Sequence, residues 1–130
     1  MASDLLRVRI DELSHRVELG RSDSLLVVGA GASWFRAPGA ERIAVDRDAP
    51  RRILQALVSC RCEGGAGLTT GELAAAGWPG EQFVADAGVN RAYVALSSLR
   101  KLGLRDLLLR QDGRVRLDPK IPIVVAADDD

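Results

Sequence analysis

Residues 68–80, Leu-Thr-Thr-Gly-Glu-Leu-Ala-Ala-Ala-Gly-Trp-Pro-Gly, contain both the start and the end of a short helix. Thr69 and Glu72 have the spacing of a capping box, in which each side chain accepts a hydrogen bond from the other residue's backbone N–H. Leu68 and Leu73 stand at the two positions of a hydrophobic staple around the same turn. The Pro-Gly pair that closes the stretch prevents the helix from continuing. The sequence therefore predicts a helix that begins after Thr69 and ends before this pair.

A longer helix is predicted downstream, from a cap at Asp86 to Leu102, with Gly103 placed for the turn that ends it. At 100° per residue its side chains separate into two groups. One group is small and apolar and is expected to face the core: Val89, Ala92, Leu96, Leu99 and Gly103. The other group is mainly polar and is expected to face outward: Asn90, Val94, Ser97 and Lys101. We therefore expect a helix that buries one side and displays hydrogen-bonding groups on the other.

A first helix of about residues 49–61 is predicted upstream of these two. Asp46 or Asp48 can cap it, and its first turn tolerates Pro50. Its apolar side chains fall on one face, as amphipathic packing requires: Ile53, Leu54, Leu57 and Val58. Trp78, at the end of the second helix, is expected to be a core residue that anchors the following turn.

A β-hairpin is predicted after the longer helix. Residues 107–110 and 114–117 are mainly apolar and basic, and they flank a turn at Asp112-Gly113. Asp-Gly between two such runs is typical of a tight hairpin, because both central residues of the turn need a positive φ.

Short strands are predicted before the first helix, as a small antiparallel sheet of about four strands within residues 5–45. The segments with alternating or short apolar patterns are residues 7–10, 16–19, 25–28, 34–36 and 42–45. Because so few short strands are not stable alone, we expect residues 1–45 to pack on a helical module of residues 46–120. Residues 121–130, which end in three aspartates, are expected to form a disordered tail.

The length and hydropathy of the chain limit the classes of protein to which it can belong. Its 130 residues are enough for one compact domain and too few for two independent cores. No apolar run approaches the roughly 18–20 residues of a membrane span. The first nine residues lack the apolar stretch of a secretory signal. A cytoplasmic protein without membrane contacts is therefore expected.

Basic side chains are concentrated in one part of a chain whose formal net charge is zero. Residues 91–120 carry eight basic and three acidic side chains, whereas residues 1–90 carry ten and twelve. Sixteen of the 18 basic residues are arginine, whose planar guanidinium suits phosphate and guanine. The distribution favours nucleic-acid contact by residues 91–120, and an ordinary solvated surface is the alternative.

Motifs for catalysis or cofactor binding are weak. Residues 29–31, Gly-Ala-Gly, follow an apolar run as in a dinucleotide-binding loop, but Trp34 replaces the third small residue. We interpret them as a glycine-rich hairpin turn. His15 is the only histidine, which argues against a Ser-His-Asp triad, and Cys60 and Cys62 supply only two of the four ligands of a structural zinc site. We therefore expect no enzyme activity, no cofactor and no metal.

The order of three helices and a hairpin across residues 49–117, after a small sheet, is that of an α+β winged helix-turn-helix. In this module the third helix lies in the major groove of double-stranded DNA, and the hairpin, or wing, reaches the backbone or the minor groove. The residues expected to contact DNA are Asn90, Arg91, Val94, Ser97, Ser98, Arg100 and Lys101 on the helix and Arg110, Arg114 and Arg116 in the wing. Asparagine can pair with adenine and valine can contact a thymine methyl, whereas the basic side chains suit phosphates.

Two stretches carry a resemblance to a known family. Residues 68–81 and residues 90–101, Asn-Arg-Ala-Tyr-Val-Ala-Leu-Ser-Ser-Leu-Arg-Lys, resemble the winged-helix effector domain of OmpR/PhoB-type response regulators. The resemblance extends from Trp34 to Leu117. Those domains begin with a four-stranded antiparallel sheet, and their recognition helix has small apolar residues before a Leu-Arg-Lys end. The resemblance implies a bacterial transcription regulator that binds double-stranded DNA, as a homodimer or a tandem pair.

Some features depart from that family. Asn90 stands where members commonly have arginine, and Ser97 and Ser98 stand near positions that are commonly basic. The alternative is a winged-helix module that contacts another protein and does not bind DNA, which the zero net charge favours. The alternatives differ in whether the arginines of residues 91–116 converge on one face or pair with nearby acids. The arginines in question are Arg91, Arg100, Arg110, Arg114 and Arg116, and the acids are Asp106, Asp112 and Asp118.

Overall fold

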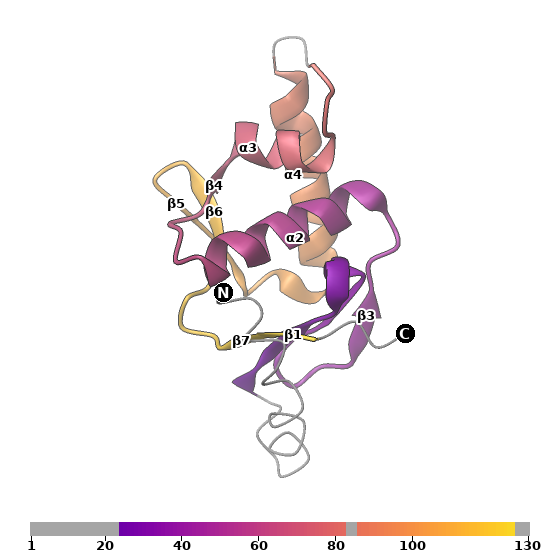
Figure 1. Ribbon diagram of the computed structural model, residues 1–130, viewed down its shortest axis with the longest axis vertical. Coiled ribbons are helices and arrows are strands. Elements are labelled where there is room, and N and C mark those ends of the chain that lie inside the picture. The colour runs from indigo at the N-terminus through magenta and orange to yellow at the C-terminus, as the bar shows by residue number, and fades with distance from the viewer. Residues whose placement is uncertain (1–23, 83–85, 127–130) are drawn as a thin grey trace.

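The computed structural model describes residues 24–82 and 86–126, and Figure 1 shows their α+β arrangement of three helices and two small sheets. The helices are α2 (Asp48–Cys62), α3 (Thr70–Gly77) and α4 (Ala87–Leu99). Sheet A contains, in spatial order, β3 (Arg42–Ala44), β2 (Trp34–Arg36), β1 (Leu26–Val28) and β7 (Ile123–Val125). Sheet B contains β4 (Leu68–Thr69), β6 (Arg114–Leu117) and β5 (Leu108–Gln111). The strands predicted at residues 7–10 and 16–19 lie outside the described residues.

Sheet A begins as the antiparallel meander that the sequence predicts for residues 25–45, with β1 paired to β2 and β2 paired to β3. A single 3-10 turn, η3 (Ala30–Ala32), connects β1 to β2, so the prediction of a glycine-rich hairpin turn is confirmed. Glycine is required just before it, because a Cβ on Gly29 would lie 2.1 Å from the indole nitrogen of Trp34.

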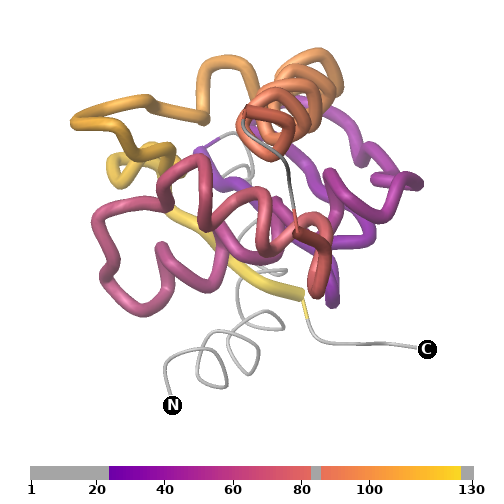
Figure 2. Tube along the Cα trace, turned by 90° about the horizontal axis from the view of Figure 1, so that it is seen from above, coloured from indigo at the N-terminus to yellow at the C-terminus, as the bar shows by residue number. Residues whose placement is uncertain are grey.

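The fourth strand of sheet A differs from the sequence-based expectation, which assigns residues 121–130 to a tail. β7 pairs in parallel with β1, and Val124 stands opposite Val27. Beyond the strand, the backbone N–H of Ala126 donates to the carbonyl oxygen of Val28 at 2.7 Å. Three apolar residues are too few for a periodic signal, and the partner strand lies at the other end of the described chain. Figure 2 shows β7, in yellow, crossing beneath the helices beside the first strands.

The main hydrophobic core lies between the inner face of sheet A and the helices. Phe35 of β2 is fully buried there, together with the predicted apolar face of α2. The N-cap of α2 is Arg47 and has no side-chain hydrogen bond, so the predicted caps at Asp46 and Asp48 are wrong. Asp48 instead lies in the first turn and pairs with Arg51 at 3.4 Å.

The capping box predicted for α3 is present. The backbone N–H of Glu72 donates to Thr69 Oγ1 at 3.1 Å, and the backbone N–H of Thr69 donates to Glu72 Oε1 at 2.9 Å. Asp86 is the N-cap residue of α4, as predicted, although its side chain makes no capping hydrogen bond. After α4 a π-helical turn, η4 (Arg100–Leu104), ends the helical segment where Gly103 adopts a φ of 142°.

Sheet B contains the predicted hairpin of β5 and β6. Asp112 and Gly113 have φ values of 54° and 76°, the positive values that a two-residue turn of this kind needs. β6 also pairs with β4, which was not predicted, so that the residue before the α3 capping box is tied to the hairpin.

Candidate functional site

The outer stripe predicted for α4 is exposed. Asn90 and Lys101 are exposed, Ser97 is partly exposed, and Val94 has 65% of its surface accessible. The opposite face of the helix is buried in the core through Ala92, Leu96 and Leu99. The predicted two-sided character of this helix is therefore confirmed, except that Gly103, expected on the buried side, is exposed and Val89 is only partly buried.

Arg110 of β5 brings positive charge to one flank of this stripe. Its guanidinium donates a hydrogen bond to the Tyr93 hydroxyl and lies 5.0 Å from the centroid of the Tyr93 ring. Tyr93 is three residues after Asn90 and four before Ser97, so these side chains are neighbours on the helix surface. Arg100, seven residues after Tyr93, lies on the same flank two turns later. The hairpin and the first residue of η4 thus place two arginines along one edge of the exposed stripe.

Arg114 and Arg116 occupy the opposite face of sheet B from Arg110, because the strand register places them beside Gln111 and Leu109. Arg114 forms an ion pair with Glu72 at 3.4 Å. Arg116 donates to the side-chain oxygen of Gln111 at 3.0 Å, while its buried Nε has no hydrogen-bond partner. The three arginines of the hairpin therefore do not converge on one face.

Arg91 and Ser98 lie on the other flank of α4. Arg91 pairs with Glu81 at 3.3 Å and stands 5.8 Å from the ring centroid of Trp78. Ser98 Oγ donates to the backbone carbonyl of Val94 at 3.2 Å. The expectation that Trp78 is a core residue is correct in part, since Trp78 packs against the core but remains partly exposed.

The acidic partners of the arginines are not those considered from the sequence. Within residues 24–82 and 86–126 the ion pairs are Arg51–Asp48, Arg91–Glu81 and Arg114–Glu72, and none uses Asp106, Asp112 or Asp118. The side chains of the second pair are 49% and 50% exposed, and those of the third are 44% and 53% exposed. Pairs so open to water contribute about 0–1 kcal/mol, so a stronger anion can replace their carboxylates.

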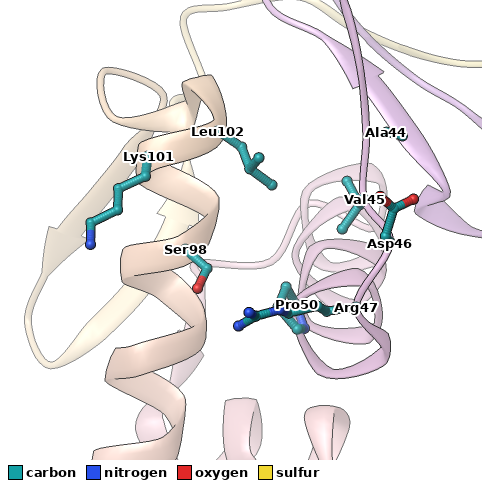
Figure 3. Close-up of a pocket in the computed structure, with 8 residues that line it drawn as sticks. All are labelled: Ala44, Val45, Asp46, Arg47, Pro50, Ser98, Lys101 and Leu102. Atoms are coloured by element: carbon teal, nitrogen blue, oxygen red, sulfur yellow. The ribbon is translucent and has the colours of Figure 1, made fainter.

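Two adjacent hollows lie beside the Arg91 and Ser98 flank, and we call them together the α2–α4 groove. It runs between residues 44–50 and residues 90–102, with Trp78 at one end. The two parts have volumes of about 350 and 320 Å³ and share Arg47, Pro50 and Ser98. Figure 3 shows the first part, where Ser98 of α4 and Leu102 of η4 point toward the start of α2 while Lys101 extends away.

Groups suited to a metal or to redox chemistry are sparse in the described part of the chain. Cys60 and Cys62 are free thiols near the end of α2, and burial raises the pKa of the Cys62 thiol. The described residues contain no group of three or more His, Cys, Asp and Glu side chains that could hold a metal ion. None of the helices between residues 24 and 126 that the structure describes has the length and apolar character to cross a membrane.

Sequence reasoning missed Tyr93, Glu72 and Arg47 as members of this surface. A signal existed for Tyr93, which is placed between Asn90 and Ser97 by helical spacing. Glu72 joins it through its ion pair with Arg114, and Arg47 joins it because residues 44–50 and 90–102 line the same groove; no local pattern indicates either. Comparison of the chain with protein families, with curated proteins and with solved structures finds no match, and the assignment of the site therefore depends on its own geometry.

Proposed function

We propose that this protein is a non-enzymatic regulator of transcription that binds double-stranded DNA in a sequence-specific manner. In this proposal the described fold is a winged helix-turn-helix of the kind found in OmpR/PhoB-type effector domains. α3 and α4 form the helix-turn-helix, α4 enters the major groove, and the β5–β6 hairpin is the wing.

The observation that carries the proposal is the contact between Arg110 and Tyr93. It supports DNA binding because it puts a hairpin cation beside the polar stripe of α4, where a duplex seated on that stripe would bring its phosphates. A helix face that contacts only water does not need a contact of this kind with an arginine of a neighbouring hairpin.

The stripe itself has the chemistry of base readout. Asn90 can donate to and accept from the edge of an adenine, and Val94 offers an exposed apolar surface to a thymine methyl group. Lys101, which extends from the C-terminal end of the stripe in Figure 3, can reach a phosphate. Together these side chains favour sites that contain A·T pairs.

A second candidate function is a protein-contact module that does not bind DNA. The ion pairs of Arg91 with Glu81 and of Arg114 with Glu72 favour it, because they partly neutralise charge that DNA would use. We rank it below DNA binding because exposed pairs of this geometry are weak.

Duplex binding at graded salt concentrations tests the proposal. Fluorescence anisotropy with a labelled random duplex library is expected to show binding near about 50 mM salt that weakens steeply as the salt concentration rises. In a plot of the logarithm of the binding constant against the logarithm of the salt concentration, each phosphate contact should add about 0.9 to the downward slope. Arg110→Ala should reduce that slope by about one, whereas the matched control Arg42→Ala, in sheet A, should not change it.

Selection from the same library tests sequence readout. Asn90→Ala should change the preference at one base position by about 1–3 kcal/mol while leaving the salt slope unchanged. If the full chain binds no duplex even at about 50 mM salt, DNA binding is wrong and the protein-contact candidate replaces it.

A further inference from the structure

The α2–α4 groove has the apolar character of a protein-binding surface. In the described ranges, 24–82 and 86–126, two large hydrophobic side chains are exposed, Val94 at 65% and Leu102 at 37%, and both line the groove. Single exposed apolar side chains are ordinary on protein surfaces, but here Val94 lines one of the two adjacent hollows and Leu102 lines the other, which indicates a contact site along the groove. Pro50 and the partly exposed Trp78 extend the same apolar lining.

The spacing of these two side chains fits a helix. Val94 lies in α4 and Leu102 lies in the η4 turn that follows it, eight residues or about two helical turns further along. Apolar side chains two turns apart on a second helix have the same separation, so one stripe of an amphipathic helix can cover both residues.

The charge of the groove indicates which amphipathic helix fits. Figure 3 shows the Arg47 guanidinium extending from the start of α2 toward α4, and no ion pair between described residues involves it. Asp46, the acidic residue of the lining, is turned away from α4 in the same view. A carboxylate placed between two apolar side chains would therefore meet Arg47 in the shared middle of the groove.

We propose that the α2–α4 groove binds an acidic amphipathic helix of a partner protein. Apolar side chains of that helix lie on Val94 and Leu102, and a carboxylate between them pairs with Arg47. Because Asn90 and Val94 also belong to the proposed DNA surface, the bound helix excludes DNA. This exclusion rests on the proposed function, whereas binding of the helix does not.

Three synthetic peptides of about 15 residues test the proposal by fluorescence anisotropy with the full chain. In the first peptide, leucines recur at alternating spacings of four and three residues, so that they form one stripe of a helix, and the other positions on that side of the helix are glutamates. The second replaces the glutamates by lysine, and the third replaces the leucines by serine. The first is expected to bind at least about tenfold more tightly than either of the others. Equal binding of all three, or no binding of the first, overturns the proposal.

Charged substitutions in the groove locate the site. Val94→Glu and Arg47→Glu should each weaken the first peptide at least about tenfold, and Gln55→Glu, at an exposed position of α2 outside the groove, should leave its affinity unchanged. Circular dichroism should show the same helix content in all variants, since these side chains are exposed. Equal losses in all three variants overturn the assignment to this groove.

Competition separates this inference from DNA binding. The glutamate peptide should displace a labelled duplex from the full chain, while the serine peptide should not. If the protein binds the duplex but not the glutamate peptide, the proposal for the groove is wrong and the proposed DNA-binding function stands. If it binds the peptide but not the duplex, the proposed DNA-binding function is wrong and the proposal for the groove stands.

Discussion

Sheet A and sheet B are both small, but they join parts of the chain at very different separations. Sheet A pairs β1 with β7, the first and last strands of the described chain. Sheet B is a hairpin with a two-residue turn, to which β4 adds two residues. Closing the long loop between β1 and β7 costs more chain entropy than closing the hairpin. Sheet A must therefore bury more apolar surface to persist.

The burial of the two sheets follows this difference. In sheet A, Leu26 and Val28 face the main core, while Val27 and Val124 form a second cluster on the other face with Trp34. In sheet B, buried Val115 and Leu117 alternate with outward-facing arginines. A substitution on either face of sheet A should thus change stability, whereas in sheet B it is the replacement of an outward-facing arginine that should mainly change what the surface binds.

The largest expected effect comes from removal of β7. A chain that ends at Pro122 loses the burial of Val124 and Val125, which are 3% and 8% exposed. At about 1.5–3 kcal/mol for each buried valine, urea unfolding should show a loss of about 3–6 kcal/mol. A chain that ends at Ala126 keeps all of β7 and is the control. If both chains unfold at the same urea concentration, β7 does not hold sheet A together.

The two sheets also differ in how much of each can be predicted from the amino-acid sequence. The hairpin of sheet B and the capping box of α3 were predictable, because Asp112-Gly113 and the Thr69–Glu72 spacing act within a few residues. β7 was not, since its stability comes from β1 and the core at the other end of the described chain. For the same reason the exposed stripe of α4 followed from helical periodicity, but the partners of its flanking arginines did not.

A matched pair of glycine substitutions tests the difference between the two sheets, with an expected destabilisation of intermediate size. Gly29→Ala in sheet A drives a Cβ into the Trp34 ring and should destabilise the protein by about 1–3 kcal/mol. Gly113→Ala in sheet B has open space around it and a φ of 76°, so only backbone strain of about 1 kcal/mol is expected.

Thermal unfolding of the two glycine variants and the parent measures both effects. The melting temperature should fall further for Gly29→Ala than for Gly113→Ala. The opposite order would mean that Trp34 moves aside easily and that the turn of sheet B is the more constrained of the two.

The smallest expected effect concerns Glu72, which links sheet B to α3 through Arg114. The hydrogen bond from the Thr69 backbone N–H, then the hydrogen bond with the Thr69 side chain, and then the charge of Arg114 hold the pKa of Glu72 below its ordinary value. Since the pKa is lower in the folded than in the unfolded chain, ionised Glu72 stabilises the fold above the ordinary glutamate pKa of about 4.3. That contribution is lost as the pH falls through the folded-state pKa.

Glu72→Gln isolates this contribution, because glutamine keeps an acceptor for the capping box but cannot titrate. The free energy of unfolding of the parent should therefore fall more steeply than that of the variant as the pH decreases from about 5 to about 3. Urea unfolding at four or five pH values in this window measures the difference between the two curves. Because Glu72 is exposed, high salt should screen its attraction to Arg114 and remove that part of the difference between the two curves. The part that comes from the Thr69 hydrogen bonds should persist in high salt. Parallel curves at low salt would show that the carboxylate acts only as a hydrogen-bond acceptor, and that sheet B is tied to α3 by strand pairing alone.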